Sequence, residues 1–495
     1  MNSTDSPLLP EVKKFLSKEV HGGFINGQEI QASNGDTFET RDPGTGERLA
    51  TVASLQADDV DRAVETAGKA FANADWARLS ANERGVHLQR LADAIETRKE
   101  IIAQIEALDC GKLLEQARDD VQNFIDTMRY FCVLSQNLSL HIPIPVKEHD
   151  ASVFRHPWGP CGFIIPWNFP FLLCGWGIAP AMAAGNTCIV KPAEDTPLST
   201  LYVAHLAKEV GIPDGVLNVV PGYGETAGAA LSNNPGIRRM SFTGSPEVGR
   251  LVAENCGRNL VPVKLELGGK GAAVVFDDVD IPEAAEKLVT AITFHTGQVC
   301  CDATRWLIQE PIYDTFVNEC VDRLKAVRIG YQMDEETQMG PVVSKTQHQR
   351  VLSYLEKGVE TGAEIVLEGG VAETGHGGHY VKPALLAGSL DNVAAREEIF
   401  GPVAYLAPFK EESDGLTMAN NTPYGLANSV WSQDIERCNR IAAQFDSGNG
   451  WINSHNVVVH GVPYGGIKQS GMGGGVGSTE TLLDYYRNIS VIRPL

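Results

Sequence analysis

Long apolar runs and a signal-like beginning are both missing from this 495-residue sequence. No stretch approaches the ~20 consecutive apolar residues that a membrane-spanning helix needs. The first twenty residues include Pro7, Pro10 and the charged stretch 11–14, without the apolar core of a secretory signal. We therefore expect a cytoplasmic protein that does not insert into a membrane.

Basic residues are also scarce. The chain has 41 Lys and Arg against 62 Asp and Glu, which gives a net charge of -21 and a pI near 5.0. A surface of this sign repels phosphate backbones and anionic lipid. The composition therefore argues against nucleic-acid partners.

Cysteine is present but without order. The ten cysteines show no regular spacing and no CxxC pair, so they predict neither a disulfide framework nor a zinc site. We expect most of them to be reduced, buried and chemically inert, and we expect no metal.

The length and the 43% hydrophobic content predict two or three domains. Residues 22–53 predict a small β-meander, and helical patterns follow over 58–138. Short apolar runs then alternate with amphipathic segments, which is typical of βαβ units in a mostly parallel α/β sheet. The predicted strands are 161–165, 187–190, 216–220, 239–242, 272–276, 304–308, 402–408 and 488–493, and the longer predicted helices are 282–294 and 312–327.

Two segments carry candidate chemistry. Cys300 and Cys301 are adjacent after a predicted helix, and taken alone they indicate two buried thiols. Glu266 lies inside an apolar, strand-like run that ends in Gly268 and Gly269. A buried carboxylate without a partner is costly, so such a residue is usually paired or functional. A thiol that attacks and a carboxylate of raised pKa that activates water would form a coherent pair.

Other segments could complete such a site. Asn168 marks a turn and a helix start, but its amide could also donate to an oxyanion. Ser245 and Pro246 follow a predicted strand and Gly244, and a helix N-terminus of this kind suits a pyrophosphate. The turn around Gly224 has GxGxxxG spacing, which does not fit the dinucleotide fingerprint.

Seven ordered segments together resemble the aldehyde dehydrogenase superfamily, and most closely its branch that oxidises general aliphatic and retinoid-type aldehydes. They are PWNFP at 166–170, KPAE at 191–194, FTGS at 242–245, LELGGK at 265–270, GQVC at 297–300, EIFGP at 398–402 and PYGGIK at 463–468. The resemblance runs from residue 22 to the last predicted strand.

The resemblance implies three structural units. A Rossmann-type cofactor domain would combine 1–133 with 154–264, and an α/β catalytic domain would cover 265–470. A small β oligomerisation flap would combine 134–153 with 471–495. The short C-terminal strand could add to another subunit's sheet edge. Relatives form homotetramers or homodimers, and we expect one of these.

The resemblance also implies an NAD-dependent oxidation of an aldehyde to a carboxylic acid. Cys300 would add to the aldehyde, and the Asn168 amide and the Cys300 backbone N–H would hold the oxyanion of the thiohemiacetal. After hydride transfer, Glu266 would activate the water that hydrolyses the thioester. The residues implied to contact the cofactor are Ile164, Ile165, Pro166, Trp167, Lys191, Glu194, Gly224, Phe242, Gly244, Ser245, Val248, Leu267, Glu398 and Phe400.

Two selectivities follow. Lys191 and Glu194 would reach the adenosine ribose, where a carboxylate repels a 2'-phosphate by about a few kcal/mol, so we expect NAD rather than NADP. The substrate passage has neither a carboxylate nor a basic residue in the implied set, which favours aliphatic, aromatic or terpenoid aldehydes over betaine aldehyde and succinate semialdehyde. The implied set is Phe169, Leu173, Trp176, Phe294, Val458 and Tyr464.

The sequence departs from many relatives at two paired positions. They have a lysine after the tryptophan that Trp176 matches and a glutamate in the C-terminal loop, and these help to pass protons away from the residue that Glu266 matches. Here the positions are Gly177 and Gly475. Joint loss is tolerable because loss of one partner would leave an unpaired buried charge.

Three other functions are possible from the sequence. The chain could be a betaine-aldehyde or semialdehyde dehydrogenase of the same superfamily, including NADP-using or CoA-acylating types. It could be a thiol hydrolase that pairs Cys300 with His295, although nothing in the sequence orients that histidine. It could also be a structural or binding protein on the same fold, against which the presence of Asn168, Glu266 and Glu398 argues.

Overall fold

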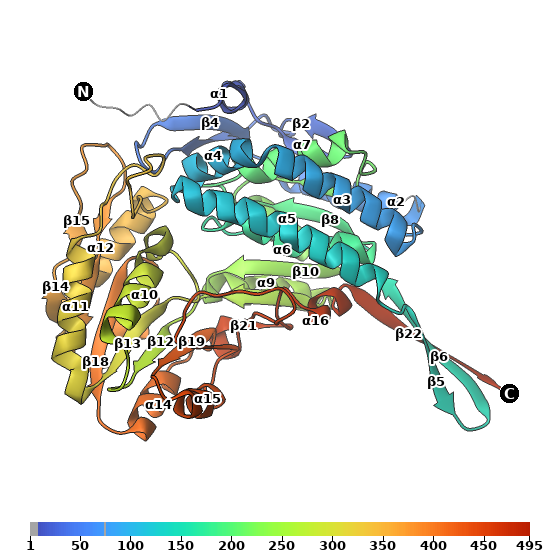
Figure 1. The fold of residues 1–495 in the computed structure, drawn as a ribbon. Helices are drawn as coiled ribbons and strands as arrows, with labels where there is room; N and C mark the ends of the chain where they lie inside the picture. Colours follow the sequence, from blue (N-terminus) through green and yellow to red (C-terminus); the bar gives the residue numbers. More distant parts are fainter. Residues whose placement is uncertain (1–7, 74–75) are drawn as a thin grey trace.

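Two large β-sheets with helices packed against them make up most of the chain (Figure 1). The structure is a computed structural model that describes residues 8–73 and 76–495. The first sheet lies in the upper half of Figure 1 and the second in the yellow and orange lower left. No helix in these two ranges is long and apolar enough to cross a membrane.

The first sheet has the strand order β2-β1-β9-β8-β7-β10-β11-β21. Its inner strands pair in parallel, whereas the two strands at one edge and the single strand at the other pair antiparallel. The strands are β1 (Gly23–Ile25), β2 (Gln28–Ile30), β7 (Pro160–Ile164), β8 (Thr187–Lys191), β9 (Leu217–Val219), β10 (Arg239–Gly244), β11 (Val263–Leu267) and β21 (Gly471–Met472).

Helices cover both faces of this sheet because its side chains alternate. Cys188 and Val190 join one apolar cluster, whereas Ile189 between them joins another. The helices of this half are α1 (Pro10–Leu16), α2 (Ala57–Asn73), α3 (Ala81–Thr97), α4 (Lys99–Cys110), α5 (Leu114–Gln136), α6 (Pro170–Ala184), α7 (Leu198–Glu209), η1 (Gly224–Gly228), α8 (Ala229–Asn233) and α9 (Pro246–Arg258).

The second sheet has the order β14-β17-β18-β13-β12-β19-β20 and is parallel except at β14. Alternation again divides the core, since Ala273 and Val275 face one cluster and Val274 faces the other. The strands are β12 (Gly271–Val275), β13 (Ala303–Gln309), β14 (Glu364–Leu367), β17 (Ala384–Ala387), β18 (Val403–Phe409), β19 (Ala427–Trp431) and β20 (Asn449–Ile452).

The helices of the second half follow the same layered arrangement. They are α10 (Ile281–Thr293), η2 (Phe294–Gly297), η3 (Glu310–Ile312), α11 (Tyr313–Lys325), α12 (Lys345–Glu360), α13 (Val393–Arg396), α14 (Glu412–Asn420) and α15 (Ile435–Ala442), with a small sheet of β15 (Gly370–Val371) and β16 (Val381–Lys382). Later in the chain, η4 (Lys468–Ser470) contacts β11 and α16 (Thr479–Leu483) packs on α5 and α6, so both lie against the first half.

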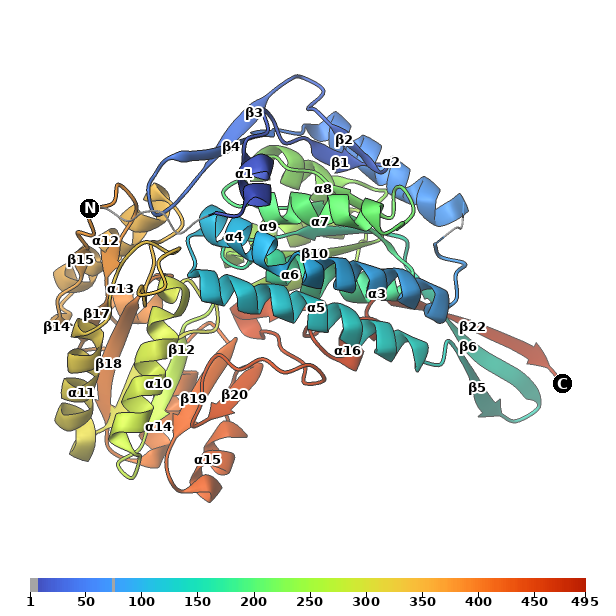
Figure 2. The ribbon, with the colours of Figure 1, turned by 45° about the horizontal axis from the view of Figure 1, so that its top comes forward.

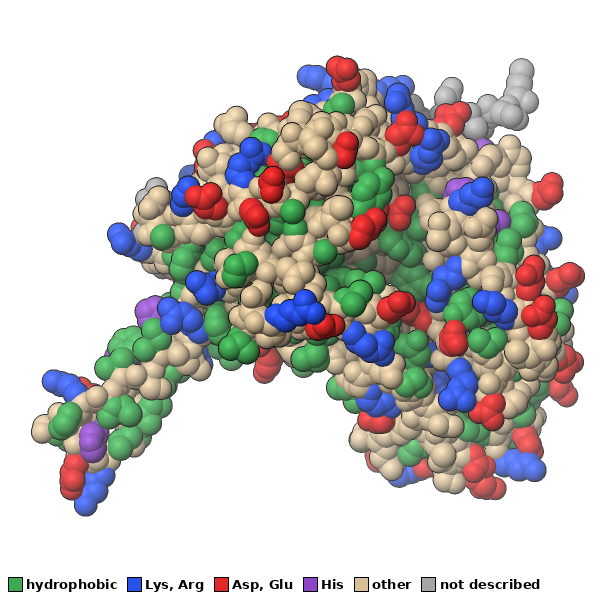
Figure 3. All heavy atoms as spheres, turned by 180° about the vertical axis from the view of Figure 1, so that it is seen from behind, with side chains coloured by type: hydrophobic (Ala, Val, Ile, Leu, Met, Phe, Trp, Pro, Cys, Tyr) green, Lys and Arg blue, Asp and Glu red, His purple; other side chains and the backbone are tan. Residues whose placement is uncertain are grey.

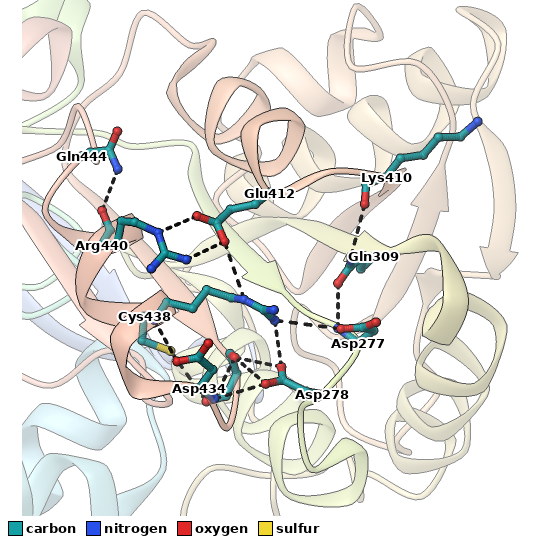
Figure 4. A network of polar contacts seen from close by, with 11 residues as sticks. Asp277, Asp278, Gln309, Lys410, Glu412, Asp434, Cys438, Arg440 and Gln444 are labelled. Carbon is teal, nitrogen blue, oxygen red and sulfur yellow. Dashed lines mark hydrogen bonds and ion pairs between the residues drawn. The ribbon is translucent and has the colours of Figure 1, made fainter.

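A polar network fixes α14 and α15 to the end of β12 (Figure 4). Arg440 pairs with both carboxylate oxygens of Glu412 at 2.8 Å. Arg437 lies over the ring of Phe276, 4.7 Å from its centroid, and reaches Asp278 at 3.3 Å. The network lies away from the cavity described below, so its role is to hold the second half together.

A three-stranded sheet projects from the body (Figures 1 and 2). It consists of β5 (His141–Val146), β6 (His149–Pro157) and β22 (Tyr486–Pro494), paired antiparallel in the order β22-β6-β5. We call these three strands the flap. Figure 3 shows hydrophobic side chains on its surface, and Ile144, Val146, Val491 and Ile492 are all exposed.

Most predicted elements are confirmed to within two residues, including the strands that became β7, β8, β10, β12, β13 and β18. The meander predicted over 22–53 is wrong. β1 and β2 extend the first sheet, whereas β3 (Thr37–Arg41) and β4 (Arg48–Ala53) form a separate two-stranded sheet. Each hairpin was visible locally, but the sequence did not show that the first one pairs with β9 nearly two hundred residues later.

Candidate active site

A largely apolar cavity of about 300 Å³ lies where the two halves of the chain meet. The first sheet contributes residues from β7, β10 and β11, and the second half contributes the loop between η2 and β13. Helices α5 and α6 and the segment 456–464 close the remaining sides. The carboxyl ends of parallel strands and a loop from the other half therefore share one cavity, as is common for ligand sites in α/β proteins.

Cys300 lines this cavity and is the one partly exposed cysteine, since the other nine are buried. Its sulfur lies 3.5 Å from the Tyr464 hydroxyl oxygen. Hydrogen bonds from Cys301 and from Tyr464 hold the pKa of the Cys300 thiol below its ordinary value, although burial opposes them. A thiol with a lowered pKa has more of the nucleophilic thiolate at neutral pH.

Backbone constraints place Cys300. His295 and Thr296 adopt positive φ values of 45° and 57°. Gly297 has φ +70°, and a Cβ there would lie 2.3 Å from the carbonyl carbon of Gly401. The loop can take this path only with glycine at that position. Its close contact with the backbone of 401–402 sets the direction in which the chain reaches Cys300.

Cys301 faces a different set of partners. Its sulfur donates to the Asn456 amide oxygen at 3.3 Å, and its carbonyl oxygen lies 2.9 Å from the His455 ring. The hydrogen bond to the Cys300 sulfur and burial raise the pKa of the Cys301 thiol well above its ordinary value. Of the two adjacent thiols, Cys300 is therefore the one suited to attack.

Glu266 lies on β11 and faces the same cavity. Both of its carboxylate oxygens are buried, and within the described residues neither has a hydrogen-bond partner. Burial raises the pKa of Glu266 to about 8, although Lys264 lowers it in part. Such a carboxyl can take up and release a proton near neutral pH, which is the property of a general base.

Asn168 lies directly before α6, where the chain turns into the helix at Pro170. Its amide nitrogen donates to the carbonyl oxygen of Gln298 at 2.9 Å. The Gln298 side chain is itself fixed, since it donates to His295 O at 3.0 Å and accepts from Val343 N at 2.9 Å. One N–H of the Asn168 amide is therefore bound to Gln298, which precedes Cys300 by two residues. The second N–H of this amide remains available to another acceptor.

All six residues implied to line the substrate passage face the cavity. They form one apolar cluster with Leu172, Val299 and Leu426. Trp176 and Tyr464 meet edge to face at 5.7 Å, and Phe169 and Phe294 lie stacked at 6.3 Å.

The cavity lining also includes carboxylates that are not among the six residues implied for the substrate passage. Asp119, Asp120 and Asn123 on α5 also line the cavity. Asp120 is paired with the buried ammonium of Lys112, and Asn123 accepts a hydrogen bond from the Trp176 indole at 2.9 Å. Asp119 is exposed and forms no ion pair with the described residues. Its place at the cavity could not be predicted from the sequence, because the sequence of α5 does not show which of its turns packs against α6.

Residues implied to contact a cofactor fall into two groups. The first group borders the cavity: Ile164, Ile165 and Leu267 line it. Trp167 and Phe400 meet edge to face at 5.2 Å. Glu398 accepts from Gly269 N at 2.9 Å, and burial raises its pKa to about 7.

Gly268 explains how Glu398 comes so close to the backbone. A Cβ at Gly268 would lie 2.1 Å from the Glu398 carboxylate. This glycine keeps the Glu398 side chain at the edge of the cavity.

The second group lies at the carboxyl ends of β8 and β10. Lys191 donates to Glu194 at 2.8 Å, and the Glu194 side chain is about one-third exposed. Ser245 caps α9 and accepts from Val248 N at 3.3 Å, as predicted. The remaining members are Pro166 after β7, Gly224 at the start of η1, and Phe242 and Gly244 on β10.

These features fit a dinucleotide. A carboxylate at the end of β8 could bind a ribose, and the N-terminus of the thirteen-residue α9 could bind a pyrophosphate. A Cβ at Gly224 would meet nothing within 4 Å, so the first turn of η1 faces open space. The deviation from the GxGxxG pattern at 222–228 arises because this turn opens a short π-helix rather than the α9 helix.

His295 does not serve as a base for Cys300. Its ring packs against Phe169 at 5.3 Å, and burial, with the nearby Lys112 ammonium, lowers its pKa well below the ordinary value. The thiol hydrolase alternative therefore lacks its histidine.

Lys264 is a site residue that the sequence reasoning missed. It lies two positions before Glu266 on β11, lines the same cavity and is almost completely buried. The two-residue period of a strand places both side chains on one face, so the sequence does contain a signal for Lys264.

The family model described as "Aldehyde dehydrogenase family" matches residues 30–491. The chain is 40% identical to human "Aldehyde dehydrogenase 1A1" over 96% of this chain and 95% of that protein, and 40% identical to human "Retinal dehydrogenase 2" over 94% and 90%. Its fold matches the NAD+ complex of aldehyde dehydrogenase from Bacillus cereus with a TM-score of 0.96 at 38% identity, covering 99% of this chain and 100% of that one. Betaine aldehyde dehydrogenase from Staphylococcus aureus with NAD+ matches with a TM-score of 0.95 at 32% identity, covering 98% and 97%.

Proposed function

The chain belongs to the aldehyde dehydrogenase family, and we propose that it uses NAD to oxidise an aldehyde with an apolar body to the carboxylic acid. The observation that carries the proposal is that Cys300 and Glu266 face one apolar cavity, the first with a lowered pKa and the second with a raised one. Those are the opposite proton affinities that a nucleophile and a water-activating base need.

The first step is attack of the Cys300 sulfur on the aldehyde carbon. This forms a thiohemiacetal whose oxygen carries the negative charge. The free N–H of Asn168 and the backbone N–H of Cys300 would stabilise that charge, as preorganised donors do in a water-poor site. The hydrogen bonds from Cys301 and Tyr464 favour the thiolate form of the sulfur before attack.

NAD supplies the acceptor for the hydride that leaves the aldehyde carbon. Glu398 and Phe400 would hold the nicotinamide end beside the cavity, and Lys191 and Glu194 would hold the adenosine ribose. Relatives of this fold were solved with NAD+. The Glu194 carboxylate, one-third exposed, disfavours a 2'-phosphate at the same position.

The second step is hydrolysis of the thioester left on Cys300. Glu266 takes a proton from water, the water oxygen bonds to the acyl carbon, and the carbon–sulfur bond breaks with its electron pair left on sulfur. The absence of hydrogen bonds to Glu266 within the described residues leaves both of its oxygens free for that water.

The substrate we propose is a medium or long aliphatic, aromatic or terpenoid aldehyde. The cavity wall next to Cys300 is built from Phe169, Leu173, Trp176 and Phe294. Each methylene that this wall removes from water contributes roughly 0.8 kcal/mol to binding.

A second candidate is an aldehyde whose far end carries a positive or hydrogen-bond-donating group. The observation that favours it is Asp119, a carboxylate on the cavity lining. Lys112 neutralises the neighbouring Asp120 but does not pair with Asp119. Such a substrate would place its apolar part against Trp176 and its polar end near α5.

We also propose that the cofactor domain combines 1–133 with 154–264, that the catalytic domain spans 265–470, and that 134–153 with 471–495, which contain most of the flap, join subunits of a homotetramer or homodimer. The support is the apolar surface of the flap, whose Ile492 is 65% exposed in the single chain. Sedimentation of the purified protein tests this directly.

NADH absorbance tests the main proposal. Purified protein with NAD and hexanal, decanal or benzaldehyde should form NADH and the matching acid in equal amounts, and the Cys300→Ala variant should form neither. Absence of NADH with every aldehyde of the panel would contradict the proposal, and turnover only with an amine-bearing aldehyde would support the second candidate.

A further inference from the structure

Lys264 occupies a position that the reaction described above does not explain. Its side chain is about 1% exposed, yet it lies in a mostly apolar cavity wall. An ammonium buried to this extent is costly unless it is paired. The question is what holds this charge and which group it acts on.

Two groups anchor the Lys264 ammonium. It donates to the carbonyl oxygen of Gly475 at 2.6 Å and lies 3.2 Å from the Asp484 carboxylate. Asp484 is also bound by Arg239 at 3.0 Å, and its side chain is about one-third exposed. A chain of charges therefore runs from the cavity through Lys264 to Asp484 at the surface.

Lys264 and Glu266 face the cavity from the same strand. They are two positions apart on β11, so both side chains leave the same face of the sheet. On the neighbouring strand β10, Ser241 pairs with Lys264 and Thr243 pairs with Glu266, and both β10 residues also line the cavity. Their side chains do not form a direct ion pair within 4.0 Å, so Lys264 acts on Glu266 through the space that both residues line.

Gly177 and Gly475 lie so close to other groups that neither position has room for a side chain of its own. A Cβ at Gly177 would lie 2.8 Å from the Phe163 ring, and one at Gly475 would lie 2.7 Å from the Tyr464 carbonyl oxygen. Neither position can carry a side chain without movement of its neighbours. The positive charge on this side of Glu266 comes from β11, and Gly475 contributes its backbone carbonyl.

We propose that Lys264 is a positioning residue for thioester hydrolysis: its ammonium, fixed by Asp484 and the Gly475 carbonyl, favours the ionised form of Glu266, which takes the proton of the attacking water. The inference rests on the proposed function, because hydrolysis of a Cys300 thioester is the step that needs an ionised Glu266.

The titratable groups around Glu266 agree with this assignment. Lys264 lowers the pKa of Glu266, whereas the Cys300 sulfur raises it. Tyr464 also lines the cavity, but its pKa is raised well above the ordinary value, so it stays neutral. Behind Lys264 lie Arg239 and Asp484, and Asp484 counteracts the burial that lowers the pKa of Lys264.

The remaining charges belong to α5. Asp119 and Asp120 line the same cavity, and Lys112 neutralises Asp120. Lys264 is therefore the cation that the structure places on the Glu266 face of β11.

The test removes the charge and leaves the volume. In Lys264→Met, the ascending limb of the pH profile of kcat should move upward by about one pH unit, and kcat at pH 7 should fall about tenfold, since one pH unit is a tenfold change in ionised fraction. The first-turnover burst of NADH should persist, because acylation of Cys300 does not use Glu266. Lys264→Arg should return the limb to within about 0.3 units of wild type.

Further variants and a second readout separate charge from packing. Lys264→Gln, which keeps a donor for the Gly475 carbonyl but no charge, should shift the limb as Lys264→Met does, and serves if the methionine variant does not fold. Lys208→Met, at an exposed ion pair with Asp214, should change nothing. The infrared band of the Glu266 carboxyl is assigned as the band that disappears in Glu266→Gln. Following that band against pH gives the pKa of Glu266 without cofactor or substrate.

The outcomes are distinct. An unmoved limb and an unmoved infrared pKa in Lys264→Met and Lys264→Gln would overturn the inference, as would a shift that Lys264→Arg fails to reverse. If wild type forms no NADH at all, the proposed function fails, while the infrared titration still decides whether Lys264 sets the pKa of Glu266.

Discussion

The sulfur of Cys300 lies 3.5 Å from the phenol oxygen of Tyr464, while the adjacent Cys301 sulfur is turned toward Asn456. Two neighbouring thiols therefore have different surroundings: one is open to the cavity and hydrogen-bonded by a neutral phenol, and the other is buried against an amide. The difference in surroundings predicts that Cys300 is reactive and that Cys301 is not.

Replacement of each cysteine tests the division. Cys300→Ala should abolish NADH formation, because no other described thiol borders the cavity in a partly exposed position. Cys301→Ala should keep most of the activity, with a modest loss from the vacated space. Steady-state kinetics with decanal and NAD measures both, and a comparable loss in the two variants would show that the nucleophile is wrongly assigned.

Tyr464→Phe tests the phenol directly. A hydrogen bond to a charged group contributes roughly 1.5 kcal/mol, so its loss should raise the apparent pKa of Cys300 by about one unit. The rate of alkylation by iodoacetamide, followed against pH, reports that pKa without substrate or cofactor. Tyr130→Phe, at a ring that packs on Phe131, is a matched control. If the pH profile of alkylation is unchanged in Tyr464→Phe, the phenol does not lower the pKa of Cys300.

Glu266 should impose a pH dependence on hydrolysis. Its pKa of about 8 means that the proton-accepting form gains population as pH rises through that value. Where hydrolysis limits turnover, kcat should therefore rise from about pH 6, reach half of its maximum near pH 8 and level about one pH unit above that value. Glu266→Gln should lose this limb and slow steady turnover far more than the first turnover, as rapid mixing would detect. A variant whose burst and steady phases keep the wild-type ratio would exclude Glu266 from the hydrolytic step.

How far the sequence predicts the structure differs from one element to the next. Apolar runs gave β7, β8 and β12, because buried parallel strands are continuous in hydrophobicity. β19 was missed, since its buried Asn428 and Ser429 satisfy their polar groups through contacts that only the fold creates. β17, with four residues, is too short to give a pattern.

The candidate site shows the same division. Cys300, Glu266 and Asn168 lie in recognisable segments, so the sequence identified them, and the structure brings Cys300 and Glu266 to one cavity. Lys264 lies just outside such a segment, and only the two-residue period of β11 places it on the same face as Glu266. Asp119 also lies outside such segments, and its position depends on the packing of α5 around the cavity, which no local pattern in the sequence specifies.

Cofactor choice should depend on Glu194. With the wild-type chain, kcat/KM should be higher for NAD than for NADP, because the Glu194 carboxylate faces the place proposed for a 2'-phosphate. Glu194→Gln keeps the shape and removes the charge, so kcat/KM for NADP should rise about tenfold, a gain of roughly 1.4 kcal/mol, in the range for two charges near a protein surface. Glu225→Gln, on the exposed turn of η1, controls for net charge. Equal use of both cofactors by wild type would contradict the assignment.

The choice of substrate tests whether the apolar wall of the cavity or the Asp119 carboxylate determines specificity. If the apolar wall of Phe169, Leu173 and Trp176 dominates, kcat/KM should increase from acetaldehyde through hexanal to decanal, since each added methylene is worth roughly 0.8 kcal/mol until the cavity is full. If Asp119 dominates, kcat/KM for an ω-amino aldehyde should exceed that for the alkyl aldehyde of equal length.

The Asp119→Asn variant separates the two possibilities. Its kcat/KM for decanal should stay within about twofold of wild type, because a distant neutral amide changes little for an alkyl chain. Its kcat/KM for an amino aldehyde should fall about tenfold, the value of one ion pair near a surface. Glu115→Gln, one helical turn away and exposed on the same helix, provides the matched loss of charge. A preference for the amino aldehyde that disappears in Asp119→Asn alone would make α5, rather than the aromatic wall, the element that selects the substrate.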